Sequence, residues 1–302
     1  MPDVVNTLLP AALAIIMFAV GVTLMPTDFT RLVARPGAVI AGLLGQVVVL
    51  PAAAWALAIA WRLPPEMAAG LMIVAASPGG ASSALIAHLA RGSAALSVTL
   101  TVLTSLAALV TMPLVVQAGV GLFLAHHTPA QFSVGSIVRG VFVIATVPVA
   151  AGMLLRAWRP ALIARLERPL SRVATLLFVA IVIATFVGQR ESLFVNLPTV
   201  GPAAATLNVL MMAAGIALGR AFAVGRRDAI AIAADCGLHN AALGIFVATA
   251  VFHAPVLAVP SVVYALVMNV GAFGLIAFGR RWTATAPTAS HNPGARVPTL
   301  GG

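Results

Sequence analysis

The residue with the clearest chemical meaning is Asp235, a carboxylate inside the apolar stretch 228–252. Placing a carboxylate in the middle of a hydrocarbon layer costs on the order of 2.5–3.5 kcal/mol on insertion scales, so the group needs a strong compensating partner. A bound cation or a carried proton would supply it. The structural alternative is a hydrogen bond to a Ser or Thr of a neighbouring helix. We predict that Asp235 is an ion-coupling residue.

Three hydroxyl groups offer oxygen ligands of the kind that surround a hard cation. Ser83 follows a Gly-rich interruption, and Ser97 and Thr101 are four residues apart, so they share one face of a helix. Each hydroxyl taken alone is more often bonded to a carbonyl of its own helix. Their occurrence beside the interruption is what favours a cation site.

Amide and imidazole groups occur in other apolar stretches. Gln46 lies midway along 37–61, where its amide oxygen would serve a cation or bridge two helices. His239 would titrate with the nearby carboxylate, contribute its backbone carbonyl, or bond to another helix. Asn240 and Asn269 supply amides near the same depth, with helix packing as the alternative role. Nothing in the spacing of the remaining histidines indicates a metal site.

Two apolar stretches are interrupted near their middle. The first contains Ser77-Pro78-Gly79-Gly80, and the second contains Asp235-Cys236-Gly237-Leu238-His239-Asn240. Proline has no backbone N–H and glycine disfavours the helix, so both helices are expected to break. After the first break the backbone N–H groups of Ala81, Ser82 and Ser83 begin a new half-helix. Its positive dipole end favours an anionic group, and hence an organic anion as substrate.

The composition indicates that these stretches lie in a membrane. The hydrophobic fraction is 61% and only 8% of residues are charged, against about a quarter in soluble domains. Stretches of about 20 apolar residues, the length that a bilayer requires, recur along the chain. We expect nine membrane segments, roughly 5–25, 37–61, 66–90, 93–124, 133–155, 172–189, 194–219, 228–252 and 255–279.

The distribution of positive charge predicts the orientation. All 17 basic residues are arginines, and fourteen of them fall in the connections that face one side if the N-terminus is outside. Only Arg62 and Arg190 fall on the other side, so we expect a multi-pass protein of the cell (inner) membrane with its C-terminus in the cytoplasm. The charges are not gathered on one face between aromatic residues, so no nucleic-acid partner is expected.

Two interrupted helices in different halves of a chain are typical of inverted-repeat transporters. We therefore expect a transmembrane domain over 1–280, followed by a disordered cytoplasmic tail over 281–302. Its core would comprise about 37–124 and 194–279, and a separate panel would comprise about 5–25 and 133–189. The chain has no nucleotide-binding P-loop, which disfavours an ATP-driven pump. We expect no enzymatic activity and no cofactor.

Several of these motifs resemble the bile acid:sodium symporter family. The similar stretches are Met17 to Leu24, Pro26 to Phe29, Gln46 with Pro51 to Trp55, Ser77 to Gly80, Leu89 to Gly92 with Ala95 to Val98, and Gly237 with Asn240 to Phe252. The resemblance covers nearly all of 10–280. It implies a core-and-panel fold with alternating access, in which the two broken helices cross and bind two sodium ions. This chain is similar to the nine-helix members.

The resemblance also implies a set of ion ligands. The first sodium site would use Ser83, Ala84, Ser97, Thr101 and Asp235, and the second would use Gln46, Asp235, Cys236, Leu238 and His239. Three positions depart from the family pattern, because Ala84 replaces an Asn, Asp235 replaces a Glu and His239 replaces a Gln. The loss of the amide oxygen at Ala84 leaves coupling to a single sodium ion, or to protons on Asp235 and His239, as open alternatives.

The function that we predict is sodium-coupled symport of an organic anion, either bile-acid-like or a small carboxylate, by alternating access. The expected substrate-binding residues are Pro78, Gly79, Gly80, Ala81, Ser82, Asn240 and Asn269. A proton-coupled or uncoupled carrier is the alternative within this class. A non-transporting membrane receptor or assembly subunit is the alternative from another class, although such a protein has no need of polar, unwound helices within the membrane.

Overall fold

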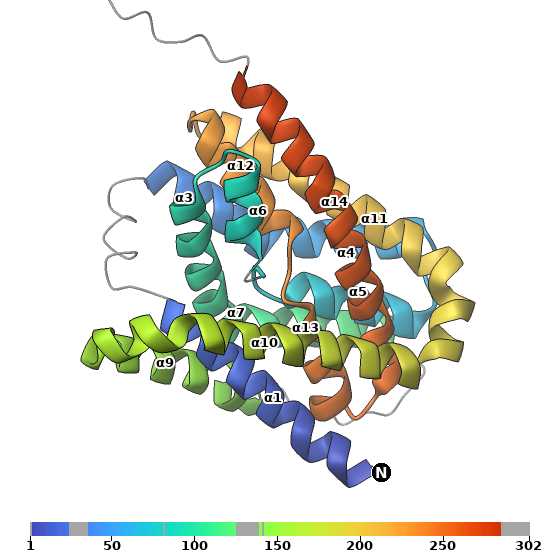
Figure 1. Ribbon diagram of the computed structural model, residues 1–302. Coiled ribbons are helices and arrows are strands. Elements are labelled where there is room, and N and C mark those ends of the chain that lie inside the picture. The colour runs from blue at the N-terminus through green and yellow to red at the C-terminus, as the bar shows by residue number, and fades with distance from the viewer. Residues whose placement is uncertain (1, 24–35, 81, 125–138, 141, 285–302) are drawn as a thin grey trace, which may run out of the picture.

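The computed structural model describes residues 2–23, 36–80, 82–124, 139–140 and 142–284 (Figure 1). Ala81, the first residues of the segment expected at 133–155 and the tail from residue 285 lie outside the described residues. The elements in chain order are α1 (Pro2–Thr23), α3 (Pro36–Leu44), η1 (Gly45–Val49), α4 (Leu50–Ala60), α5 (Pro65–Ala76), α6 (Ser83–Leu89), α7 (Ala94–Phe123), η2 (Phe142–Thr146), α9 (Val147–Trp158), α10 (Pro160–Gly188), α11 (Arg190–Ala221), α12 (Arg226–Gly237), α13 (Ala241–Phe246), η3 (Val247–Val251), η4 (Pro255–Ala258) and α14 (Val259–Ala284). All are helical, as the sequence predicts.

Several helices have the length and apolar character of membrane spans. Among the described residues four helices qualify, namely Pro36–Ala60, Pro160–Gly188, Arg190–Ala221 and Pro255–Ala284, and there are five if the two bent parts of α7 form one span. Large apolar side chains on α10 and α14, such as Leu176 and Phe273, point outward, as expected where lipid replaces water. The chain is a multi-pass helical membrane protein. The count of nine segments stays a prediction, since the other apolar helices are shorter.

The start of α10 corrects one predicted boundary. We expected a segment over 172–189, preceded by an arginine-rich connection, but the helix begins at Pro160. Proline is well suited to the first helical position, because its missing N–H would have no partner there. Ile163 is buried while Arg165 and Arg168 are exposed, so the connection is itself an amphipathic extension of the helix.

Smaller corrections concern α7, α11 and α14. The α11 helix begins at Arg190 rather than at 194. The α14 helix continues to Ala284, past the expected end of the segment at 279 and of the transmembrane domain at 280. The helix α7 bends by 60° between Ala108 and Val110. Pro113 lies one turn later in α7 and removes a backbone hydrogen bond at this place, which explains the bend.

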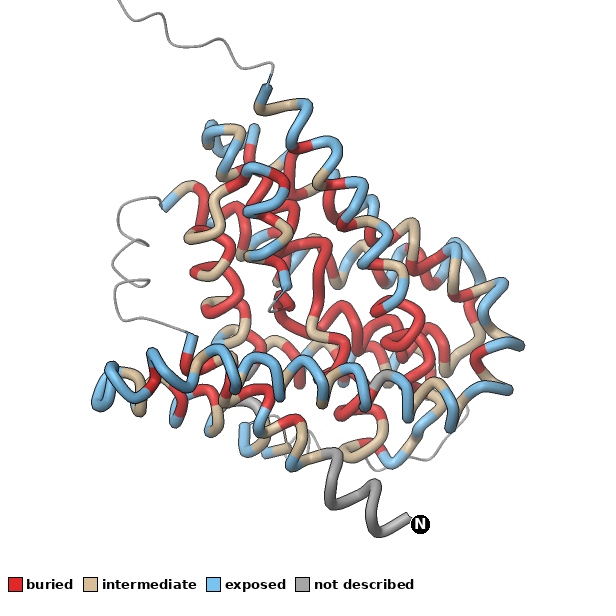
Figure 2. Tube along the Cα trace, in the orientation of Figure 1, coloured by how far each residue is buried: buried red, intermediate tan, exposed pale blue. Residues whose placement is uncertain are grey.

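The buried residues concentrate around α5, α12 and α13, in the middle of the molecule (Figure 2). The helix α12 packs against α11, α7, α14 and α6, and α5 packs against α7, α4 and α14. Nearly every residue of α5 and the second half of α12 is buried. Both interrupted segments therefore lie in the interior of the helical assembly, where other helices surround them.

A second group of helices, which we call the outer layer, consists of α1, η2, α9 and α10. These elements pack on one another and lie together on one side of the molecule (Figure 1). Glycines bring α1 and α9 into direct backbone contact, because a Cβ on Gly21 would overlap the backbone of Val149 and a Cβ on Gly152 would overlap the backbone of Phe18 and Val22. The two helices are therefore closely fitted.

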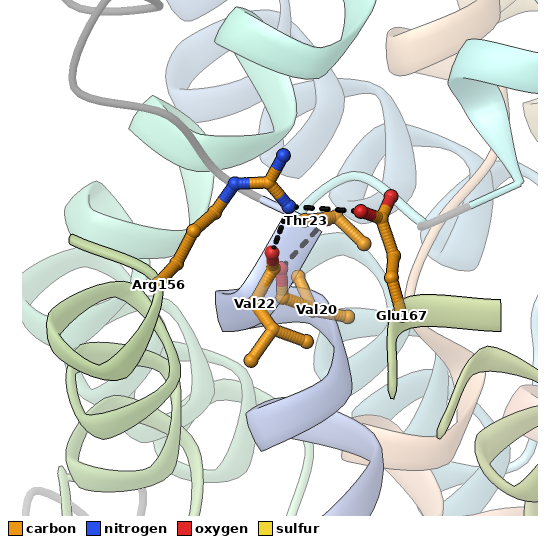
Figure 3. A network of polar contacts seen from close by, with 5 residues as sticks. All are labelled: Val20, Val22, Thr23, Arg156 and Glu167. Atoms are coloured by element: carbon orange, nitrogen blue, oxygen red, sulfur yellow. Dashed lines mark hydrogen bonds and ion pairs between the residues drawn. The ribbon is translucent and has the colours of Figure 1, made fainter. Parts of the chain in front are cut away.

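Arg156 ties three helices of the outer layer together. Its guanidinium donates to the carbonyl oxygen of Val22 at the end of α1 and to Glu167 of α10 at 3.0 Å (Figure 3). The Arg156 side chain is 15% exposed and that of Glu167 is 39% exposed. The carbonyl near the helix end has no partner within its own helix, so the arginine satisfies a group that would otherwise lack a donor.

We expect Arg156→Met to destabilise the outer layer more than Glu167→Gln. The first change removes both bonds, including a charge-assisted bond of about 1.5–3 kcal/mol. The second change removes a half-exposed ion pair, and such pairs contribute about 0–1 kcal/mol. The thermal unfolding midpoints of the two purified variants in detergent test this order. Equal midpoints would show that the hydrogen bond from Arg156 to the carbonyl oxygen of Val22 does not stabilise the protein.

Candidate functional site

The first break follows from the sequence at Pro78. The helix α5 ends at Ala76, and Ser77 is extended, with φ −74° and ψ 139°, because a residue that precedes proline avoids the helical conformation. The chain becomes helical again at Ser83, where α6 begins. Gly79 lies between the two half-helices, and its backbone N–H donates to Oγ1 of Thr104 on α7 at 3.3 Å.

The second break lies between α12 and α13. The helix α12 ends at Gly237, and Leu238 is extended, with φ −114° and ψ 109°. Asn240 then caps α13, since its side-chain oxygen accepts a hydrogen bond from the backbone N–H of Leu243 at 3.1 Å. Both interruptions predicted from the sequence are therefore present.

The two breaks meet through their backbones. Gly79 and His239 form an isolated antiparallel bridge. The N–H of Gly80 donates to the carbonyl oxygen of Leu238 at 2.7 Å, and the N–H of Asn240 donates to the carbonyl oxygen of Pro78 at 2.9 Å. Non-helical backbone at membrane depth needs protein partners of this kind. The bridge thus satisfies both breaks at once and brings residues from the two halves of the chain together.

Asp235 lies beside this bridge with the three predicted hydroxyls around it. Its Oδ1 accepts from Oγ1 of Thr101 at 2.7 Å and from Oγ of Ser83 at 3.3 Å. Oγ of Ser83 is 3.0 Å from Oγ1 of Thr101 and accepts from Oγ of Ser97 at 3.1 Å. Asp235, Ser83 and Ser97 are fully buried. The structure therefore gathers four of the predicted ligands from α6, α7 and α12 into one cluster of oxygens.

Gln46 and His239 form a second polar group next to the bridge. Nε2 of Gln46, which lies in the π-helical turn η1, donates to the carbonyl oxygen of Ser77 at 3.0 Å and lies 3.2 Å from Nδ1 of His239. The ring of His239 packs on the ring of Tyr264, with 5.2 Å between the centroids. A cavity of about 10 Å³, with room for roughly one water-sized species, is lined by Gln46 and Ser77 among others.

We call the region around the backbone bridge between Gly79 and His239 the crossing. Three buried polar atoms in this region have no hydrogen-bond partner among the described residues. They are Oδ2 of Asp235, Oε1 of Gln46 and Nε2 of His239. Buried polar atoms are normally paired, and the exceptions need an explanation. Two of the three are oxygens with free acceptor capacity, which is the ligand type that hard cations prefer.

Glycine is required at position 79 because a side chain there has no room. A Cβ on Gly79 would overlap Oδ1 of Asp235 and lie 2.8 Å from its Cγ. The backbone of the first break is therefore packed directly on the carboxylate. Cys236 is likewise fully buried and fits against Gly45 of η1.

Other predicted residues are not among the buried polar groups of the crossing. Asn269 is exposed on α14 and donates to the carbonyl oxygen of Ala265 in its own helix at 2.6 Å. The structure does not bring it to the other predicted substrate residues, because α14 turns that face outward. Ser82 is exposed and Ala84 is partly buried.

A small cavity lies between the crossing and the outer layer. Its volume is about 50 Å³, and its lining includes Met17 of α1, Pro78, Ser105 of α7, Thr146 of η2 and Leu243 of α13. Oγ1 of Thr146 has no partner among the described residues. The sequence reasoning missed Thr146 and Ser105, which are unremarkable hydroxyls until the packing of the outer layer places them opposite Pro78.

The sequence reasoning also missed Asn208 and Tyr264. Nδ2 of Asn208 and the hydroxyl of Tyr264 both donate to the carbonyl oxygen of Gly237, at 2.7 Å and 2.9 Å. Asn208 is a polar residue in the middle of an apolar stretch, and Tyr264 is the only tyrosine of the chain. Either feature is a signal that could have indicated a role.

Taken together, the fold and the site define a multi-pass membrane protein in which two interrupted helices meet at a buried carboxylate, an architecture typical of secondary transporters. Comparison with known proteins identifies the group. A model of the sodium bile acid symporter family matches residues 10–196, and the chain belongs to that family. This membership agrees with the resemblance inferred from the sequence.

Individual relatives support this assignment. The chain is 33% identical, over 85% of its length and 78% of the relative's, to an uncharacterized sodium-dependent transporter of Bacillus subtilis (strain 168). It is 28% identical to a probable chloroplastic sodium/metabolite cotransporter of Oryza sativa subsp. japonica, over 90% of this chain and 64% of that one. It is 29% identical to the ileal sodium/bile acid cotransporter of Oryctolagus cuniculus, over 51% and 54% of the two chains. All three are named as transporters, not as enzymes.

Proposed function

We propose that this protein is a secondary active transporter that couples the entry of sodium to symport of a small organic anion. The observation that carries the proposal is the cluster at the crossing. There, Asp235 has one oxygen bonded to Thr101 and Ser83 and the other without a partner among the described residues. A buried carboxylate surrounded by hydroxyls needs a positive charge. Two relatives of the protein are named as sodium cotransporters, which supports sodium as that charge.

The proposed ion ligands fall into two groups that share Asp235. Ser83, Ser97 and Thr101 form the first group, on the α7 side of the carboxylate. Gln46 and His239 form the second, together with the backbone of Cys236 and Leu238, on the η1 side. The first group contains only oxygen ligands, the type that hard cations such as sodium prefer. The second contains imidazole, so its ion and its contribution to coupling depend on how His239 is oriented.

The proposed substrate site is the cavity between the crossing and the outer layer. Pro78 lines this cavity from the first break, and Thr146 offers a hydroxyl from the other side. We propose that the site extends from Pro78 to its neighbours Gly79 and Gly80 and to Asn240 of the second break. Apart from Thr146 and Ser105 the lining is apolar, and none of the described residues that form it is an arginine. We infer that the charge of the anion is met by the coupled cation at Asp235, so that neither binds well alone.

Alternating access would then depend on the outer layer and the remaining helices moving relative to one another. We propose that the outer layer is the panel and that the other described helices form the core, as the sequence analysis expects. The units 36–123 and 190–284 each contain a long span, a broken segment and a further span, which supports an inverted repeat. Nine spans, with the N-terminus outside and the C-terminus inside, complete the proposal.

Uptake into proteoliposomes tests the coupling ion. A labelled bile acid and labelled small carboxylates are offered with sodium chloride outside, or with choline chloride at the same concentration and pH. We expect uptake to fall to background when choline replaces sodium, because Asp235 then lacks its cation. If uptake persists in choline and disappears when a protonophore is added, transport is coupled to protons and not to sodium.

Proton coupling is the second candidate function, because two titratable side chains at the crossing each have an atom without a hydrogen-bond partner among the described residues. Oδ2 of Asp235 and Nε2 of His239 are both buried without partners among the described residues. A proton bound to Asp235 would neutralise the carboxylate as a sodium ion does. A receptor or assembly subunit that does not transport would show no uptake under either gradient.

A further inference from the structure

The second break has a buried anchor that the proposed ion site does not include. Asn208 of α11 and Tyr264 of α14 both donate to the carbonyl oxygen of Gly237, at 2.7 Å and 2.9 Å. Nδ2 of Asn208 also lies 3.3 Å from the hydroxyl of Tyr264. Asn208 is 1% exposed and Tyr264 is fully buried. Two side chains from two helices thus converge on one backbone oxygen.

The position of this oxygen explains why it needs donors. Gly237 is the last residue of α12, and the final carbonyls of a helix have no partner within the helix. In an interior without water, an unpaired carbonyl is strongly unfavourable. Asp235 lies two residues before Gly237, and Leu238, which pairs with Gly80, directly follows it. Holding Gly237 therefore fixes both the carboxylate and the bridge between the breaks.

The first break is held by side-chain contacts of the same kind. Nε2 of Gln46 donates to the carbonyl oxygen of Ser77, the last residue before Pro78, at 3.0 Å. Gln46 precedes Ser77 by 31 residues, and Asn208 precedes Gly237 by 29. In both halves, the helix before the broken segment thus supplies an amide that donates to the carbonyl at the break.

The helix after each broken segment supplies the second contact. Thr104 follows Gly79 by 25 residues and accepts from its N–H. Tyr264 follows His239 by the same interval, packs on its ring and donates to the oxygen of Gly237. Gly79 and His239 are the two residues that form the bridge. Asn208 and Tyr264 are therefore the counterparts, in the second half, of Gln46 and Thr104.

From this correspondence we propose that Asn208 and Tyr264 are positioning residues of the coupling site. They hold the Gly237 carbonyl, and through it they keep Asp235 and His239 in the geometry that binds the coupling cation. Neither residue contacts the ion. The inference rests on the proposed function, because it assigns these residues to the site where sodium is proposed to bind.

A glycine on α14 gives a way to disturb this anchor without replacing either of its residues. A Cβ on Gly271 would overlap Oδ1 of Asn208, whereas a Cβ on Gly274, three residues later, would meet nothing within 4 Å. Gly271→Ala must therefore displace the Asn208 amide. Gly274→Ala makes the same chemical change in the same helix and leaves the amide in place, so it is a matched control.

The experiment measures how sodium stabilises the purified protein. Thermal unfolding midpoints in detergent are recorded as sodium chloride replaces choline chloride at constant ionic strength. Loss of one hydrogen bond changes an equilibrium by about three- to tenfold. We expect the variants Tyr264→Phe, Asn208→Leu and Gly271→Ala to need more sodium than the parent protein, by such a factor, for the same increase in the unfolding midpoint. Gly274→Ala is expected to match the parent protein.

A spectroscopic measurement separates positioning from general stability. The chain has one tyrosine, so incorporation of 3-fluorotyrosine places a single ¹⁹F label at position 264. We expect sodium to shift its resonance in the parent protein and to shift it less in Gly271→Ala. A residue that only stabilised the fold would give a resonance that does not respond to sodium.

The outcomes distinguish the two proposals. If sodium stabilises the parent protein and the three variants respond at the same sodium concentration, or if sodium leaves the ¹⁹F resonance unchanged, the positioning role is wrong and the proposed function stands. If sodium has no effect on the parent protein, sodium coupling itself is wrong, and the positioning role for a sodium site is wrong with it.

Discussion

Replacing Asp235 with Asn is expected to abolish sodium-driven uptake while leaving the fold intact. The amide keeps the shape of the carboxylate and can still accept hydrogen bonds from Thr101 and Ser83. It lacks the negative charge that attracts the cation, and contacts to charged groups contribute about 1.5–3 kcal/mol. Sodium affinity should therefore fall by about one to two orders of magnitude. Uptake at limiting sodium and sodium-dependent thermal stabilisation are the two measurements.

The same variant should be at least as stable as the parent protein in sodium-free buffer. Removing a buried charge that lacks a full set of partners relieves a desolvation cost, so the unfolding midpoint should not fall. Glu66→Gln is the control, because Glu66 lies in the first turn of α5, away from the crossing. Wild-type sodium dependence in Asp235→Asn would remove the basis of the proposed coupling site.

Gly79→Ala is expected to impair both stability and uptake. The added methyl group would overlap Oδ1 of Asp235, so either the backbone of the first break or the carboxylate must move. Forcing one extra carbon into a well-packed interior costs about 1–3 kcal/mol. A displaced carboxylate would also lose its bonds to Thr101 and Ser83, so uptake should fall even at temperatures where the variant remains folded.

Gly121→Ala is the matched control for this change. A Cβ at Gly121, on the neighbouring helix α7, would meet nothing within 4 Å. We expect an unchanged or slightly higher unfolding midpoint, because alanine favours a helix more than glycine does. If Gly79→Ala transported as well as Gly121→Ala, the close approach of Gly79 to Asp235 would have no functional importance.

The sequence predicted the features of this protein that depend on local chemistry. A run of proline and two glycines, or a glycine among polar residues, is unfavourable in a helix, so the breaks near Pro78 and Gly237 could be predicted from this local clustering. A single proline such as Pro113 stays inside its helix. The shared face of Ser97 and Thr101 likewise follows from helix periodicity. In the structure, these hydroxyls and Asp235 belong to one hydrogen-bonded cluster.

Other features could not be predicted because they depend on packing between distant segments. Asn269 has the same amide as Asn208, but α14 turns Asn269 outward while α11 turns Asn208 toward Gly237. Residue type does not distinguish these two orientations. The start of α10 was missed for a related reason, since arginines on an amphipathic helix resemble those of a connection until the buried face, here Ile163, is known.

The glycine contacts between α1 and α9 have a mechanical consequence. Gly21 and Gly152 each place one helix directly on the backbone of the other, and backbone atoms, unlike long side chains, cannot rearrange to accommodate sliding. The pair can therefore shift along its axis only by first separating, which would open a gap in a close-packed interior. We therefore expect α1 and α9 to move together as one rigid unit when either helix is displaced.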